Sequence, residues 1–94
     1  MRSRLTDDQI KTELAGLGGW AREGNSLTKT YKFAKFAEGI AFVDRVAKAA
    51  DAADHHPDID IRYTKIKIEL STHDAGGITA ADAKLAKEIE TMSR

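Results

Sequence analysis

The chain has 94 residues with 15 basic and 15 acidic side chains, so its formal net charge is zero. This length supports one compact domain, residues 1–94, and the balanced charge gives no field that favours nucleic acid or an anionic membrane as a partner. With no cysteine, disulfide bonds and thiolate metal sites are excluded. No apolar run is long enough for a signal peptide or a membrane span, so we expect a cytoplasmic protein.

The first predicted helix covers residues 6–17. Thr6 can cap its start together with Gln9, three residues later, and Gly18-Gly19 ends the pattern. Its apolar residues share one face: Ile10, Leu14 and Leu17. The helix is therefore expected to pack on a core by that face.

Two short strands are predicted next, near residues 20–23 and 27–33, and Gly24-Asn25 joins them as a hairpin. A long helix follows over residues 35–53. Its apolar residues recur at helical spacing: Phe36, Ile40, Val43, Val46, Ala47 and Ala50. The larger aromatic residues are interpreted as core: Trp20, Phe33, Phe36 and Phe42.

Pro57 blocks continuation of the long helix, and the alternation after it predicts strands at 59–63 and 66–71 with Thr64-Lys65 as the turn. The expected inward residues are Ile59, Ile61, Tyr63, Ile66, Ile68 and Leu70. Thr79 can cap a last helix with the stripe Ala81, Leu85, Ile89 and Met92. The order helix, strand, strand, helix, strand, strand, helix predicts a two-layer α+β fold, a four-stranded antiparallel sheet with helices on one face.

All three histidines lie within residues 54–74: His55, His56 and His73. The predicted hairpin brings the entry of its first strand and the exit of its second to the same sheet edge. With Thr64 and Lys65 as the loop, His56 faces His73. Like charges then also face each other, Arg62 with Lys67 and Asp60 with Glu69, so a register shifted by two residues is the alternative. Either register brings the histidines near one another.

Three clustered imidazoles beside carboxylates can donate and accept protons near neutral pH, which indicates acid–base chemistry. Two other interpretations compete. A His-His-Pro segment can be an ordinary solvated loop, and histidines with acids can bind zinc, although the spacing lacks the helical i, i+4 pattern and there is no thiol. We therefore expect no metal. Asp82, three residues after Thr79, is placed to cap the last helix.

A longer pattern with fixed spacing includes the histidines and is more specific than the cluster alone. It consists of Asp51, His55-His56-Pro57, Tyr63, His73 and Asp82. With the segments LGGW, LTKTYKF, VAKAADAADHHP and IELSTHDAGGITAAD, it resembles the signature of the pterin-4a-carbinolamine dehydratases over nearly the whole chain. Two positions depart from the family pattern: Ala81 stands where many members have a basic residue, and DIDI lacks an aromatic residue.

The resemblance implies a hydro-lyase of the 4a-hydroxytetrahydrobiopterin dehydratase class. It would remove water from the carbinolamine that an aromatic amino acid hydroxylase leaves, giving quinonoid dihydropterin in tetrahydrobiopterin recycling. The implied assembly is a homodimer or homotetramer with a functional link to such a hydroxylase, and no cofactor is implied. Proton delivery to the departing hydroxyl and proton removal from the ring need no metal.

The resemblance also assigns roles to residues. The implied catalytic residues are His55, His56, His73 and Asp82. The implied pterin contacts are Asp54, His55, His56, Ser71, Thr72 and His73, with Asp51 and Tyr63 as supporting residues. For Asp82, capping and a role in the site are both open, and one carboxylate can do both.

Two other functions remain as alternatives. One is a non-catalytic dimerisation partner of a transcription factor, because animal relatives of this fold have that role. The other is a related pterin step in molybdenum cofactor supply.

Overall fold

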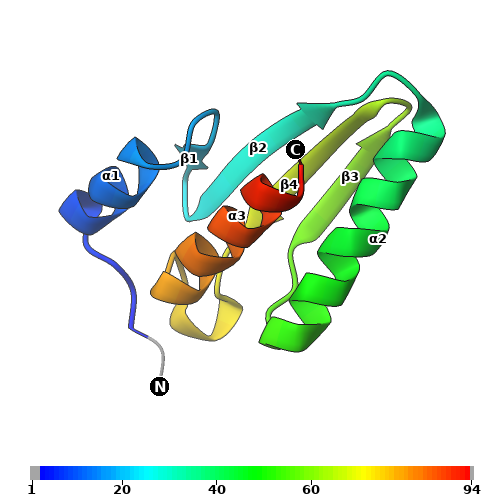
Figure 1. The fold of residues 1–94 in the computed structure, drawn as a ribbon. Coiled ribbons are helices and arrows are strands. Elements are labelled where there is room, and N and C mark those ends of the chain that lie inside the picture. The colour runs from blue at the N-terminus through cyan, green and yellow to red at the C-terminus, as the bar shows by residue number, and fades with distance from the viewer. Residues whose placement is uncertain (1–2, 94) are drawn as a thin grey trace.

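The computed structural model describes residues 3–93. Its elements are α1 (Asp7–Ala15), β1 (Ala21–Glu23), β2 (Ser26–Lys32), α2 (Phe36–Ala53), β3 (Asp58–Arg62), β4 (Lys65–Leu70), a short 3-10 helix η1 (His73–Ala75) and α3 (Ala80–Met92). The strands form one antiparallel sheet in the order β1-β2-β4-β3. Helices α2 and α3 lie across one face of the sheet and α1 lies beside β1 (Figure 1). The predicted fold class is confirmed.

The predicted caps of the first and last helices are present. Thr6 accepts a hydrogen bond from the backbone N–H of Gln9, whose side chain in turn accepts from the backbone N–H of Thr6. Thr79 and Asp82 form the same reciprocal box at the start of α3. Each box satisfies backbone donors that a helix start would otherwise leave unpaired.

The buried side of α2 differs from the predicted stripe. Gly39 and Phe42 face the core together with Val46 and Ala50, whereas Phe36 is 49% exposed. Ile40 and Ala47, two other members of the apolar series, are also exposed, and the interpretation of Phe36 as a core residue was wrong. The helix contacts the sheet along the Gly39 side, where a Cβ on Gly39 would lie 3.4 Å from the Ile66 side chain.

The β3–β4 register is the two-residue alternative, and the preferred register was wrong. Arg62 pairs with Lys65 and Asp60 with Lys67, so the loop is Tyr63-Thr64 and opposite charges face each other at the second pair. Tyr63 has a positive φ of 53° and is 74% exposed, so its place as an inward strand residue was also wrong. The direct opposition of His56 and His73 does not occur.

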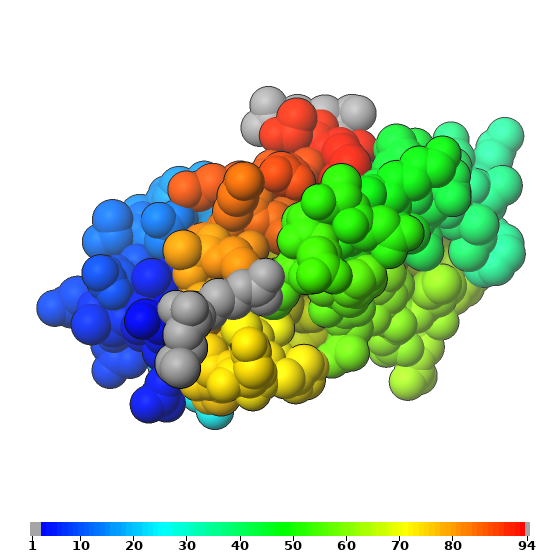
Figure 2. Space-filling view, turned by 90° about the horizontal axis from the view of Figure 1, so that it is seen from below, coloured from blue at the N-terminus to red at the C-terminus, as the bar shows by residue number. Residues whose placement is uncertain are grey.

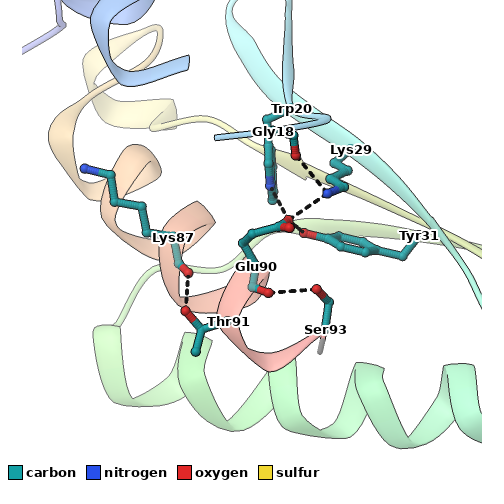
Figure 3. Close-up of polar contacts among 8 residues, drawn as sticks. All are labelled: Gly18, Trp20, Lys29, Tyr31, Lys87, Glu90, Thr91 and Ser93. Carbon is teal, nitrogen blue, oxygen red and sulfur yellow. Dashed lines mark hydrogen bonds and ion pairs between the residues drawn. The ribbon is translucent and has the colours of Figure 1, made fainter. Parts of the chain in front are cut away.

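A carboxylate in the last turns of α3 ties that helix to the sheet. Oε1 of Glu90 accepts hydrogen bonds from Trp20 Nε1 at 3.2 Å, Lys29 Nζ at 2.8 Å and Tyr31 Oη at 2.7 Å (Figure 3). Lys29 Nζ also donates to the backbone oxygen of Gly18. Because β2 supplies Lys29 and Tyr31, the contacts hold α3 against that strand.

Candidate functional site

The end of α2 directs the first histidine segment into the molecule. Asp54 takes the left-handed conformation, with φ of 50°, and terminates the helix. The chain reverses there, and the backbone N–H of His55 bonds to the carbonyl of Ala50 at 3.1 Å. Pro57 then starts the extended path into β3, because its ring cannot continue a helix.

The second histidine segment follows β4. Thr72 pairs with Gly77 as an isolated bridge, and η1 forms the short reversal between them. The C-terminal end of α2, the start of α3 and the segment 71–77 all gather at one end of the molecule, as the bottom of Figure 1 and the view from below in Figure 2 show.

A pocket of about 330 Å³ opens between these segments. Its lining residues are Asp54, His55, His56, Ser71, Thr72, His73 and Asp74. All six residues expected to contact a pterin are among them. The structure therefore brings the segments Asp54-His55-His56 and Ser71-Thr72-His73 to one site, although the register differs from the preferred prediction.

His55 and Asp82 form a buried pair behind this pocket. Nε2 of His55 lies 2.5 Å from Oδ1 of Asp82, and the side chains are 7% and 0% exposed. Away from water, a hydrogen bond to a charged group is stronger, so the pair fixes the imidazole ring in one orientation.

The other carboxylate oxygen of Asp82 is held by two more donors. Oδ2 accepts from the hydroxyl of Thr72 and from the backbone N–H of Thr79, both at 2.8 Å. The two threonine hydroxyls lie 2.8 Å apart. Since Thr72 donates its proton to Asp82, the hydroxyl of Thr79 is the donor to Thr72.

This network selects a tautomer of His55. An ionised Asp82 can only accept hydrogen bonds, so Nε2 of His55 carries the proton. In the neutral ring, Nδ1 then holds the lone pair and is the atom that can take up a proton. Asp82 both caps α3 and positions His55, which combines the two roles left open by the sequence.

The other two histidines are exposed. Nε2 of His56 lies 2.9 Å from Oδ1 of Asp51, with both side chains largely in water. His73 begins η1, and its side chain is exposed in the pocket wall. The site therefore combines one imidazole fixed by a buried carboxylate with two that meet solvent.

Tyr63, expected as a supporting residue, lies in the turn at the other end of the hairpin from the histidines. Thr79 was not among the predicted site residues, and Asp74 was predicted only as a carboxylate close in sequence to the histidines. The sequence predicted that Thr79 caps the last helix with Asp82 near its start, but only the fold reveals that the Asp82 carboxylate also reaches His55.

Among residues 3–93, no three histidine or carboxylate side chains are grouped so that they could hold a metal ion. No helix in that range has the length and apolar character needed to cross a lipid bilayer.

The fold and pocket define an α+β protein that holds three imidazoles and a buried carboxylate in one site, a set suited to proton transfer. Comparison with known sequences is specific: the family model described as Pterin 4 alpha carbinolamine dehydratase matches residues 3–92. The chain belongs to the pterin-4a-carbinolamine dehydratase family.

Two relatives and two solved structures illustrate the similarity. Proteins of Roseiflexus sp. (strain RS-1) and Mycobacteroides abscessus, each named "Putative pterin-4-alpha-carbinolamine dehydratase", are 50% and 54% identical. The first alignment covers 98% of this chain and 99% of the relative, and the second covers 94% of each. A transcriptional coactivator/pterin dehydratase from Brucella melitensis has a TM-score of 0.94 at 29% identity, covering 98% of this chain and 100% of that one.

A more distant structure shares the fold alone. A pterin dehydratase-like protein described as a RuBisCO assembly factor in the alpha-carboxysome has a TM-score of 0.68 at 24% identity. The match covers 80% of this chain and 89% of that one.

Proposed function

We propose that this protein is a hydro-lyase that converts 4a-hydroxytetrahydropterin to quinonoid dihydropterin and water. The observation that carries the proposal is the pocket in which His55, fixed by buried Asp82, lies beside exposed His56 and His73. Family membership supports the choice of a pterin as substrate.

The reaction needs two proton transfers. The bond between C4a and the hydroxyl oxygen breaks, the oxygen takes a proton and leaves as water, and a ring N–H gives up its proton as a C=N bond forms. General acid–base catalysis of this kind contributes about 10²–10⁴-fold in rate.

His55 suits the role of base. Asp82 holds Nε2 as a donor, so Nδ1 is the basic nitrogen of the ring, and the carboxylate stabilises the imidazolium that forms when the ring takes up a proton. Exposed His73, on the other pocket segment, suits the acid that protonates the hydroxyl. His56 and Asp54 border the ring, with Asp51 holding the His56 imidazole.

The test adds purified protein to freshly generated 4a-carbinolamine and follows the absorbance change against a buffer blank. The wild type is expected to accelerate water loss, with His55→Ala and His73→Ala each losing about 10²-fold or more. Lys11→Ala, an exposed change on α1, serves as the control and should retain full activity. Equal rates with and without the wild-type protein would refute the proposal.

The second candidate function is binding of a partner protein without catalysis. One observation favours a surface for such a contact. Phe36 and Ile40 on α2 and Ile61 on β3 are 49%, 39% and 40% exposed, and large apolar side chains that gather on a surface are typical of a contact site. The first turn of α2 and the end of β3 lie at the same end of the molecule (Figure 1). We define these three residues as the far-end patch.

We propose that the far-end patch is a site of self-association, giving a homodimer or homotetramer. A mutant without the three histidines separates this role from catalysis: an assembly that persists while activity is lost means that the two roles are independent. Capture of one stoichiometric foreign partner by that mutant would instead favour the coactivator-like role.

A further inference from the structure

A second hollow, of about 710 Å³, adjoins the histidine pocket. The segment before α1 and the segment 74–78 line much of it, and Asp74 lines both hollows. In the view from below, the residues around 71–77, in yellow, lie between the N-terminal part of the chain, in blue, and the end of α2, in green (Figure 2). This yellow segment is the wall that the two hollows share.

Arg4 is held against that wall. The backbone N–H of Leu5 donates to the carbonyl of Ile78 at 2.8 Å, which aligns the segment before α1 with the chain leading to α3. The Cδ atom of Arg4 lies 2.9 Å from the position that a Cβ on Gly77 would occupy. Gly77 pairs across the loop with Thr72, which lines the histidine pocket. The Thr72–Gly77 pair therefore lies between the Arg4 side chain and the histidine pocket.

The two arginines of the second hollow differ in their partners. Arg22 forms an ion pair with Asp7 at 2.7 Å and donates to the carbonyl of Gly24. Arg4 has no hydrogen bond or ion pair from its side chain to any residue in the range 3–93, and the same is true of Asp74. The second hollow is therefore lined by two charged side chains that can bind a ligand: the carboxylate of Asp74, where the two hollows meet, and the guanidinium of Arg4 farther from the histidines.

We propose that the second hollow receives the substituent at ring position 6 of the pterin, and that Arg4 selects substituents carrying a carboxylate or phosphate. The inference rests on the proposed function. Position 6 is bonded to N5, which adjoins the reacting C4a, so a ring held at the histidines directs this substituent toward the pocket margin. Asp74 accepts O–H or N–H donors close to the ring, and Arg4 binds the anion beyond it.

The size and chemistry of the two hollows fit such a ligand. The histidine pocket, at about 330 Å³, matches the low end of small-molecule sites and leaves little room for a long substituent. Guanidinium groups bind carboxylate and phosphate with paired N–H donors. Gly77 lets the Arg4 side chain lie close to the loop backbone, because a Cβ at this position would shift that side chain.

The test measures dissociation constants of three stable dihydropterins by titration calorimetry on the full chain. The probes are 7,8-dihydrobiopterin, which has a neutral side chain, 7,8-dihydroneopterin 3′-phosphate and dihydrofolate, which carries carboxylates. The wild type is expected to bind at least one anionic probe about tenfold more tightly than the neutral one, the scale of one additional charge-assisted contact.

Arg4→Gln should remove that tenfold advantage and leave the neutral probe within about twofold, whereas Arg62→Gln, the same change on exposed β3, should alter neither. A response confined to the phosphate or to the carboxylate probe identifies which anion is used. Equal binding of all three probes, or anionic binding indifferent to Arg4→Gln, overturns this inference while leaving the dehydratase proposal intact. Failure of every pterin to bind overturns both.

Discussion

Asp82 has two structural roles because its two carboxylate oxygens accept hydrogen bonds from different partners. Oδ2 receives the donors at the start of α3 and Oδ1 receives the imidazole of His55. Both residues are buried, so each lost hydrogen bond leaves a polar group without water to replace it. Stability and the orientation of the proposed base therefore depend on the same contacts.

Thr72→Val tests this coupling, because it keeps the side-chain shape and removes the hydroxyl that donates to Asp82. We expect the free energy of unfolding to fall by about 1–3 kcal/mol and kcat to fall severalfold, since the carboxylate loses a fixed donor. Urea denaturation and the carbinolamine assay measure the two effects.

The matched control is Thr28→Val. Thr28 is also buried and donates to a carboxylate, that of Glu23 at 3.1 Å, but it lies on β2 and does not line the histidine pocket. The Thr28→Val variant should have a lower free energy of unfolding and an unchanged kcat. Thr72→Ser should restore both properties, and a Thr72→Val enzyme with unchanged kcat would contradict the coupling.

Tyr63 affects the stability of the fold through its backbone conformation rather than through side-chain contacts. A left-handed backbone costs a non-glycine residue roughly 1–2 kcal/mol, and asparagine adopts it more readily than tyrosine. Because Tyr63 is exposed in the turn, Tyr63→Asn should raise the free energy of unfolding by about 0.5–1 kcal/mol. Chemical denaturation checks this, and a less stable variant would show that the ring has a packing role.

At the scale of elements, Glu90 links α3 to β2. Burial of the carboxylate opposes ionisation, but hydrogen bonds from Lys29 and Tyr31 outweigh it and lower the pKa of Glu90 below its usual value near 4.5. Burial, followed by the hydrogen bond to Glu90, raises the pKa of Tyr31 above its ordinary value. The charged carboxylate and the neutral phenol therefore both favour the folded state.

The pH dependence of stability follows from the lowered pKa. A carboxyl group with a lower pKa in the folded state stabilises it above the unfolded pKa, and this contribution is lost as pH falls through the folded value. Glu90→Gln should reduce the free energy of unfolding by about 1–3 kcal/mol at pH 7, and the difference from wild type should shrink below pH 4.5.

Denaturant unfolding at pH 7, 5 and 3 measures this difference. Glu88→Gln, an exposed neighbour on the same helix, is the control and should show little change at any of these pH values. A Glu90→Gln deficit that stays constant down to pH 3 would mean that packing, rather than charge, links the helix to the sheet.

Helix α2 shows how much of one element the spacing of apolar residues can predict. The spacing of its apolar residues predicted a helix over 35–53, and the structure places it at Phe36–Ala53. Which side faces the sheet could not be read, because apolar residues occupy two adjacent stripes. In the structure the Gly39 side of the helix lies against Ile66, and Phe36 and Ile40 lie toward solvent.

At the scale of the whole molecule, the exposed far-end patch predicts self-association. The double change Phe36→Ser with Ile40→Ser should convert the assembly to monomers, because it removes two large apolar side chains from the proposed contact. Light scattering during size-exclusion chromatography gives the mass. Lys11→Ser on α1 is the control, and a wild type that is already monomeric would refute the prediction.

The histidine segments show what could be predicted about the site. Their convergence followed from hairpin topology alone, because the entry and exit of paired strands meet at one edge whichever register is adopted. The register itself did not follow, since Thr64-Lys65 and Tyr63-Thr64 are both poor turn sequences. In the structure, the Tyr63-Thr64 loop pairs Asp60 with Lys67 rather than with Glu69.

The sequence by itself determined the order of elements, the helix caps and the two segments that carry the imidazoles, because these depend on local periodicity and on short-range hydrogen bonds. Only the tertiary structure decided that His55 is buried against Asp82, 27 residues away, while His56 and His73 stay exposed. That division depends on how the ends of α2 and α3 pack together. Packing between distant segments also placed Arg4 over Gly77 and opened the second hollow beside the site.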